Sequence, residues 1–158
     1  MKQEEISTFS RKIAASNASG LIEVLYDIYF TYENEALMAL EKADWNEYLN
    51  SLRKASQVIE HLKNTLDFKY DIAKELYPLY NFAEVSLSKA IYSRDKQYIL
   101  NAREVMRPLQ EAFVEVAKVD KSKPLMENTQ QVTAGLTYGR NNLTESLGAE
   151  EPRRGFWI

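Results

Sequence analysis

Apolar side chains recur every three or four residues through most of the first 119 residues, which is the spacing of amphipathic α-helices. The pattern predicts a short leading helix over about residues 2–15. Four longer helices are predicted over about residues 16–43, 44–66, 72–93 and 95–119. Isolated helices of this length are marginal in water, so their apolar stripes are expected to pack against one another.

Polar residues at the predicted helix starts indicate where these helices begin. Ser16 is a candidate N-cap for the first long helix, because its hydroxyl group can accept a free backbone N–H. Asp44, with Glu47 three residues later, fits a capping box for the next helix. Asp67 or Asp71 is expected to cap the helix over residues 72–93.

Two prolines lie inside predicted helices. Proline lacks a backbone N–H and clashes with the preceding turn. We therefore expect a kink at Pro108, and at Pro78 either a kink or a helix that starts only there.

The connections between the long helices are short, so neighbouring helices should run antiparallel. The predicted fold is all-α: an antiparallel up-down four-helix bundle with a short N-terminal helix and an irregular C-terminal tail. Four of the five glycines lie in the last 24 residues, which supports this division. We expect a bundle domain over residues 1–120, with the leader helix over 1–15, and an irregular extension over 121–158. The extension ends in Phe156, Trp157 and Ile158, which either dock onto the bundle or a partner, or belong to a disordered tail.

Composition and charge narrow the range of functions. The 158 residues are 45% hydrophobic and carry a formal net charge of −3, from 20 basic and 23 acidic residues. This balance argues against a nucleic-acid-binding protein. The chain has no cysteine, which excludes disulfides, thiolate metal sites and cysteine nucleophiles.

The ends of the chain and its most apolar window bear on location. No apolar segment typical of a secretory signal follows Met1. The most apolar window, residues 21–30, is too short to span a bilayer and contains Glu23 and Asp27. We therefore expect a cytoplasmic protein without membrane insertion.

The sequence offers little for catalysis. A di-iron site in a helical bundle needs two histidines, whereas this chain has only His61. Glu23 and Asp27 lie four residues apart, and a solvated edge beside the apolar stripe is favoured over a functional carboxylate pair. No phosphate-binding loop or nucleophile motif is present. We predict no catalytic residue, no metal site and no cofactor.

Aromatic side chains are the unusual feature of the composition. The chain has ten tyrosines, six phenylalanines and two tryptophans. Six tyrosines fall beside the apolar stripes: Tyr26, Tyr29, Tyr48, Tyr77, Tyr80 and Tyr92. They could close the rim of the core or form a protein-binding surface, and the pattern leaves both alternatives open.

The start of the first long helix carries a resemblance to a known family. The segment ASNASGLIEVLYDIY resembles the flagellin export chaperones of the FliS family, which typically show a polar cap followed by Leu-Ile-x-x-Leu-Tyr-Asp-Gly. The matching positions are Leu21, Ile22, Leu25, Tyr26 and Asp27. Two positions differ, because Ile28 replaces the usual glycine and Asn17 stands where proline often opens the helix.

Two later segments extend the resemblance to about residues 15–118. KADWNEYLNSLRKASQVIEHLKNTLDF is similar to the second helix of that family. IAKELYPLYNFAEVSLSKA is similar to its Ile-Ala-x-x-Leu-x-x-Leu-Tyr-x-Tyr pattern, with Phe82 in place of the second aromatic residue and Pro78 as a departure.

The resemblance implies a cytoplasmic chaperone that binds the C-terminal amphipathic segment of flagellin. Such a chaperone prevents premature polymerisation and delivers flagellin to the flagellar export apparatus. The alternatives are a helical adaptor, or an export chaperone for another flagellar or secreted cargo. Contact with the flagellar export gate and formation of a homodimer are left open.

The cargo-binding residues are a hypothesis from the apolar stripes and their neighbours. The expected groove is lined by Ile22, Tyr26, Tyr29, Leu52, Ile59, Tyr77 and Tyr80. For Leu52 and Ile59 a core position is the stronger alternative, because both fit the stripe. Ile6, Phe9 and Ile13 of the leader are expected to cover this groove until flagellin displaces them.

Overall fold

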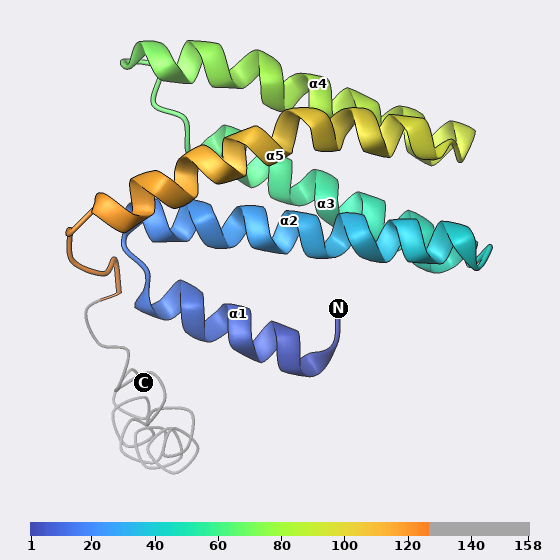
Figure 1. The fold of residues 1–158 in the computed structure, drawn as a ribbon, viewed down its shortest axis with the longest axis horizontal. Coiled ribbons are helices and arrows are strands. Elements are labelled where there is room, and N and C mark those ends of the chain that lie inside the picture. Colours follow the sequence, from blue (N-terminus) through green and yellow to red (C-terminus); the bar gives the residue numbers. More distant parts are fainter. Residues whose placement is uncertain (127–158) are drawn as a thin grey trace, which may run out of the picture. The chain divides into compact units, whose positions relative to one another are not determined.

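The computed structural model describes residues 1–126, and these form five α-helices joined by short connections (Figure 1). The helices are α1 (Gln3–Ala15), α2 (Ala18–Glu41), α3 (Trp45–Asn64), α4 (Asp71–Ser93) and α5 (Lys96–Val119). The described residues contain no strand. The predicted all-α class is confirmed. The C-terminal residues Phe156, Trp157 and Ile158 lie outside the described part, and the predicted domain division at residue 120 stays a prediction.

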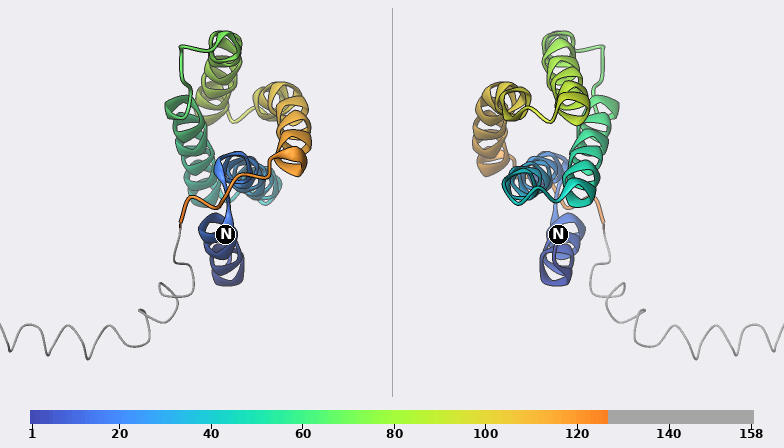
Figure 2. Two further views of the ribbon diagram at one scale, coloured as in Figure 1. Left: turned by 90° about the vertical axis from the view of Figure 1, so that its left-hand side faces the viewer. Right: turned by 90° about the vertical axis from the view of Figure 1, so that its right-hand side faces the viewer.

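The four long helices form an antiparallel ring. Contacts join α2 to α3, α3 to α4, α4 to α5 and α5 back to α2. Successive helices run in opposite directions in Figure 1, and Figure 2 shows the four helices end-on. The short α1 lies outside the ring and packs against α2. This arrangement confirms the predicted helical bundle with a short N-terminal helix.

The core inside this ring is built from the predicted stripes together with four tyrosines. Leu52, Ile59, Leu62 and Leu87 are fully buried aliphatic residues. Tyr26, Tyr29, Tyr48 and Tyr80 are also buried, with exposed fractions of 1% or less. Burial of large aromatic side chains contributes strongly to stability when their hydroxyl groups find partners. Most of the tyrosines beside the stripes therefore belong to the core itself.

The N-caps confirm one expectation and correct two. Asp44 accepts a hydrogen bond from the backbone N–H of Glu47 at 3.1 Å, which is the predicted cap, but the Glu47 side chain accepts from Ser51 Oγ and does not complete the capping box. The cap of α2 is Asn17, not Ser16, because the Asn17 side chain accepts from the Gly20 N–H at 2.8 Å. The cap of α4 is Tyr70, which makes no side-chain cap bond, so the expectation of an aspartate cap was wrong.

Both prolines lie inside continuous helices. The helix α4 begins at Asp71 and continues through Pro78, so the alternative of a helix that starts at Pro78 was wrong. Pro108 lies near the middle of α5. Residues on both sides of each proline keep their helical conformation, and the predicted kinks at Pro78 and Pro108 stay predictions.

Residues 120–125, which follow α5, cross the junction between α1 and α2, and we call them the strap. The side-chain amide of Asn17 donates to the carbonyl oxygen of Asp120 at 3.2 Å. The backbone N–H of Leu125 donates to the carbonyl oxygen of Ser16 at 3.0 Å. The residue that caps α2 therefore also holds the end of α5.

Candidate partner-binding site

An apolar hollow, called the end pit here, opens at one end of the ring. It has a volume of about 240 Å³ and is lined by residues of α2, α4 and α5 and of the α3–α4 connection. Its apolar lining residues are Ile22, Leu66, Ile72, Ala73, Leu76 and Phe113. Apolar concave surfaces of this kind are typical binding sites for apolar groups of a partner.

The pit arises from the way α4 and α5 are joined. A short connection at Arg94 and Asp95 holds the end of α4 against the start of α5. Towards the other end the two helices separate, as Figure 1 shows for the start of α4 and the end of α5. Stripe residues at that end, such as Ile72 and Leu76 of α4, therefore lack a helix directly opposite and line the pit.

Large apolar side chains remain exposed on α4, both at the pit and further along the helix. Ile72 is 58% exposed, and Leu79 and Phe82 are exposed on the same helix. Val116 of α5 is exposed as well. An apolar surface that no part of the described chain covers is typical of an interaction site. Its helical framework suits an amphipathic helix laid along a groove.

The structure separates the seven predicted cargo-binding residues into three groups. Ile22 and Tyr80 line the end pit. Tyr77 is 40% exposed on α4, where its ring packs edge-on against Phe68 and under the Lys63 ammonium group. The remaining four lie in the buried core: Tyr26, Tyr29, Leu52 and Ile59. A buried side chain can shape a binding surface but does not contact a partner directly, and a binding role for these four stays a prediction.

Two buried tyrosines pair beneath the pit. The hydroxyl groups of Tyr26 and Tyr80 form a hydrogen bond of 2.7 Å between α2 and α4. The Tyr26 ring also stacks on Phe113 of α5, with ring centroids 5.6 Å apart. Burial away from water raises the pKa of both phenols above the usual value, and more strongly that of Tyr26, so they remain neutral donors and acceptors. The pair ties together the three helices that surround the pit.

A second polar contact joins α2 to α5. Glu33 is fully buried and accepts hydrogen bonds from Arg103 Nε at 2.7 Å and from the Tyr29 hydroxyl group at 3.2 Å. Burial raises the pKa of Glu33, and the hydrogen bond from Arg103 opposes this shift. These groups satisfy one another between α2 and α5, so they hold the two helices together.

The sequence analysis did not predict Ile72, Leu76 and Phe113 as site residues, although all three lie on apolar stripes at helical spacing. Tyr70, which lines the pit, was not predicted either, and Phe68 of the same connection is exposed. The sequence feature that could have identified them is their position near helix ends, where the facing helix can diverge and leave a stripe residue uncovered.

The three leader residues lie elsewhere. Ile6 is 43% exposed, and Phe9 and Ile13 are half-buried on α1, which packs against α2. None of the three lines the end pit. Their role as a cover for a cargo groove stays a prediction, and the surface they cover belongs to α2.

The described part of the chain also bears on metal binding and on membrane insertion. Within residues 1–126, no group of three or more His, Cys, Asp and Glu side chains is arranged to hold a metal ion. None of the described helices combines the length and the apolar character needed to cross a membrane.

Comparison with known proteins supplies a family. The sequence model of the family described as "Flagellar protein FliS" matches residues 2–120, a range that contains all five helices and the end pit. No curated protein matches the chain.

Proposed function

The chain belongs to the FliS family, a family of flagellar export chaperones, and from this premise we propose that it is a cytoplasmic chaperone for flagellin. It binds the C-terminal amphipathic segment of flagellin, prevents premature polymerisation and delivers the segment to the flagellar export apparatus. The end pit is the observation that carries this proposal.

The pit supports this proposal because its chemistry complements an amphipathic helix. Its lining is mostly apolar, and exposed Leu79, two turns after Ile72 on the same face of α4, extends the apolar surface along this helix. A partner helix could place one large apolar side chain in the pit and the next along this edge, at the spacing of successive helical turns. A segment that orders only on binding loses entropy, which offsets part of the contact energy.

Calorimetric titration of the full chain with the C-terminal segment of its own organism's flagellin tests the proposal. We expect saturable one-to-one binding with a negative heat-capacity change, because apolar surface is buried. Circular dichroism should show a gain of helicity on mixing. Absence of binding in the micromolar range would contradict flagellin as cargo and favour the alternative, an adaptor or export chaperone for another flagellar or secreted protein.

Two variants on α4 locate the binding surface. Ile72→Ser removes an exposed apolar side chain that lines the pit, and we expect about a tenfold loss of affinity. Val85→Ser is the matched control, because Val85 is a similarly exposed β-branched residue that does not line the pit. Equal affinities for the two variants would place the cargo elsewhere on the bundle.

The leader completes the proposal. If Ile6, Phe9 and Ile13 cover a cargo surface, deletion of residues 1–14 should tighten binding, and weaker binding would contradict this role. Contact with the export gate and formation of a homodimer also stay predictions. Sedimentation of the free chain and of its flagellin complex tests the homodimer.

A further inference from the structure

The surface of α2 under α1, called the leader dock here, holds the leader helix loosely. The dock consists of Gly20, Glu23, Val24, Asp27 and Glu35. No residue of α1 is buried, and a cavity of about 300 Å³ remains between the two helices. Since so little apolar surface is enclosed, polar contacts must supply much of the free energy that keeps α1 on α2.

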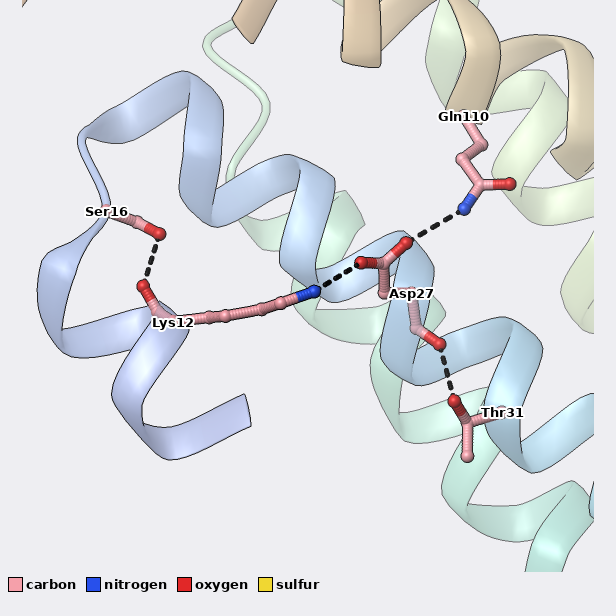
Figure 3. Close-up of polar contacts among 5 residues, drawn as sticks. All are labelled: Lys12, Ser16, Asp27, Thr31 and Gln110. Carbon is pink, nitrogen blue, oxygen red and sulfur yellow. Dashed lines mark hydrogen bonds and ion pairs between the residues drawn. The ribbon is translucent and has the colours of Figure 1, made fainter. Parts of the chain in front are cut away.

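Asp27 makes the central polar contact of the dock. Its two carboxylate oxygens accept from different helices, as Figure 3 shows: Lys12 Nζ of α1 at 3.3 Å and Gln110 Nε2 of α5 at 3.0 Å. In the sequence, Lys12 lies between Phe9 and Ile13, two half-buried apolar residues of α1. The helix that the dock already holds is thus amphipathic with a cation at the edge of its apolar stripe.

Glu35 adds a second anionic position two helical turns further along α2. Its Oε1 atom contacts the amino group of Met1, whereas its Oε2 atom is buried and has no hydrogen-bond partner among residues 1–126. A buried carboxylate oxygen without a donor is costly, so this atom favours any partner that brings a further donor. Asp27 and Glu35 are about 12 Å apart along the helix axis.

Val24 supplies the apolar part of the dock. It is only 5% exposed, yet it does not belong to the core cluster, and it lines the cavity together with Lys12. The dock therefore combines an apolar floor with carboxylates beside it. This combination complements a helix that carries lysine or arginine next to its apolar stripe.

We propose that the leader dock selects a cationic amphipathic helix, and that Asp27 is the specificity-determining residue. In the free protein, Lys12 of the leader pairs with Asp27. In the complex, a lysine or arginine of the flagellin segment replaces Lys12 at the same carboxylate, and α1 leaves the dock. This inference rests on the proposed flagellin-binding function and adds a charge requirement at a surface separate from the end pit.

Two variants of the full chain remove the same ion pair from opposite sides. Lys12→Gln weakens the leader but leaves Asp27 free for the partner, so we expect the flagellin segment to bind about two- to fivefold more tightly. Asp27→Asn weakens the leader equally but removes the charge that the partner needs, so we expect no gain of affinity. The asparagine oxygen can still accept from Gln110, which preserves the contact with α5.

Hydrogen exchange of the α1 amides shows whether both variants release the leader. We expect similarly faster exchange in both, confined to α1. Lys118→Gln is the matched control, because it removes one positive charge from another exposed ion pair, with Glu115 of α5. This control should change neither the exchange of α1 nor the affinity.

Salt provides a second readout of the charge requirement. Raising the salt concentration from about 0.05 M to about 0.5 M should weaken flagellin binding more in Lys12→Gln than in Asp27→Asn, because only the former keeps the screened pair. Equal gains of affinity in both variants would overturn the proposal, since the leader would then act only by occupying space. Unchanged affinity in Lys12→Gln despite a released α1 would also overturn it.

A probe without flagellin separates this inference from the proposed function. The synthetic leader peptide, residues 1–15, can be titrated into the full-length Lys12→Gln variant. At low salt, we expect the leader peptide with Lys12 to bind this protein more tightly than a leader peptide that carries the Lys12→Gln substitution. Equal affinities of the two peptides would overturn the charge requirement. If the peptides differ but flagellin does not bind, only the identity of the cargo is overturned.

Discussion

The leader helix and the four-helix ring have similar amphipathic patterns but are held in different ways. Each helix of the ring faces two neighbours, and the buried core residues all come from α2–α5. The leader faces α2 and buries no residue of its own. The difference teaches that an apolar stripe stabilises a helix only as far as neighbouring helices enclose it.

The largest effect should come from a cavity inside the ring. Leu52 is fully buried in the core cluster. We expect Leu52→Ala to lower the free energy of unfolding by about 2–5 kcal/mol, because lost transfer free energy and a residual cavity add together. Urea denaturation measures this loss. A change below about 0.5 kcal/mol would contradict the enclosed core.

A smaller effect should follow from breaking the buried polar contact between α2 and α5. Arg103→Ala leaves the buried Glu33 carboxylate without its cation, at a cost of about 1–3 kcal/mol at neutral pH. Burial already raises the pKa of Glu33, and loss of Arg103 raises this pKa further.

The sign of the pH dependence follows from this raised pKa. A carboxyl group with a raised pKa in the folded state favours folding at low pH and loses that contribution as pH rises through the folded pKa. The loss caused by Arg103→Ala should therefore be smaller near pH 4.5, the ordinary carboxyl value, than at neutral pH. Equal losses at the two pH values would show that Glu33 is not the group left unpaired.

The junction between ring and leader should show an intermediate effect. Asn17 caps α2 and also donates to the strap at Asp120. We expect Asn17→Ala to cost about 1 kcal/mol and to speed hydrogen exchange of α1. Ser19→Ala is an informative comparison, because Ser19 also donates to Asp120, and this hydrogen bond together with those from Ser122 lowers the pKa of Asp120 to about 2.

The smallest effect is expected in the leader itself. Ile6 is 43% exposed, so Ile6→Ala should change the free energy of unfolding by less than about 0.5 kcal/mol. Urea denaturation beside Leu52→Ala makes the comparison direct. A loss as large as that of Leu52→Ala would mean that the leader belongs to the cooperative core.

The candidate site was less predictable than the fold. Periodicity placed Ile72, Leu76 and Phe113 on apolar stripes but could not show that α4 and α5 separate where these residues lie. It also placed Tyr26 and Tyr29 beside the stripe, whereas the structure buries both completely. Residues at the edge of a stripe are buried only if a neighbouring helix covers that side. The sequence does not show where the neighbouring helices lie, so it cannot decide this.

The sequence by itself determined the five helices, their order and the antiparallel bundle, because these depend on local periodicity, caps and short connections. It also carried the family resemblance through the Leu-Ile-x-x-Leu-Tyr-Asp pattern at residues 21–27. Only the tertiary structure decided which stripe residues are enclosed and which line the end pit. It also joined Lys12, Asp27 and Gln110 from three helices. Those outcomes depend on the distances between helices, which arise from packing of the whole ring and have no local signal in the chain.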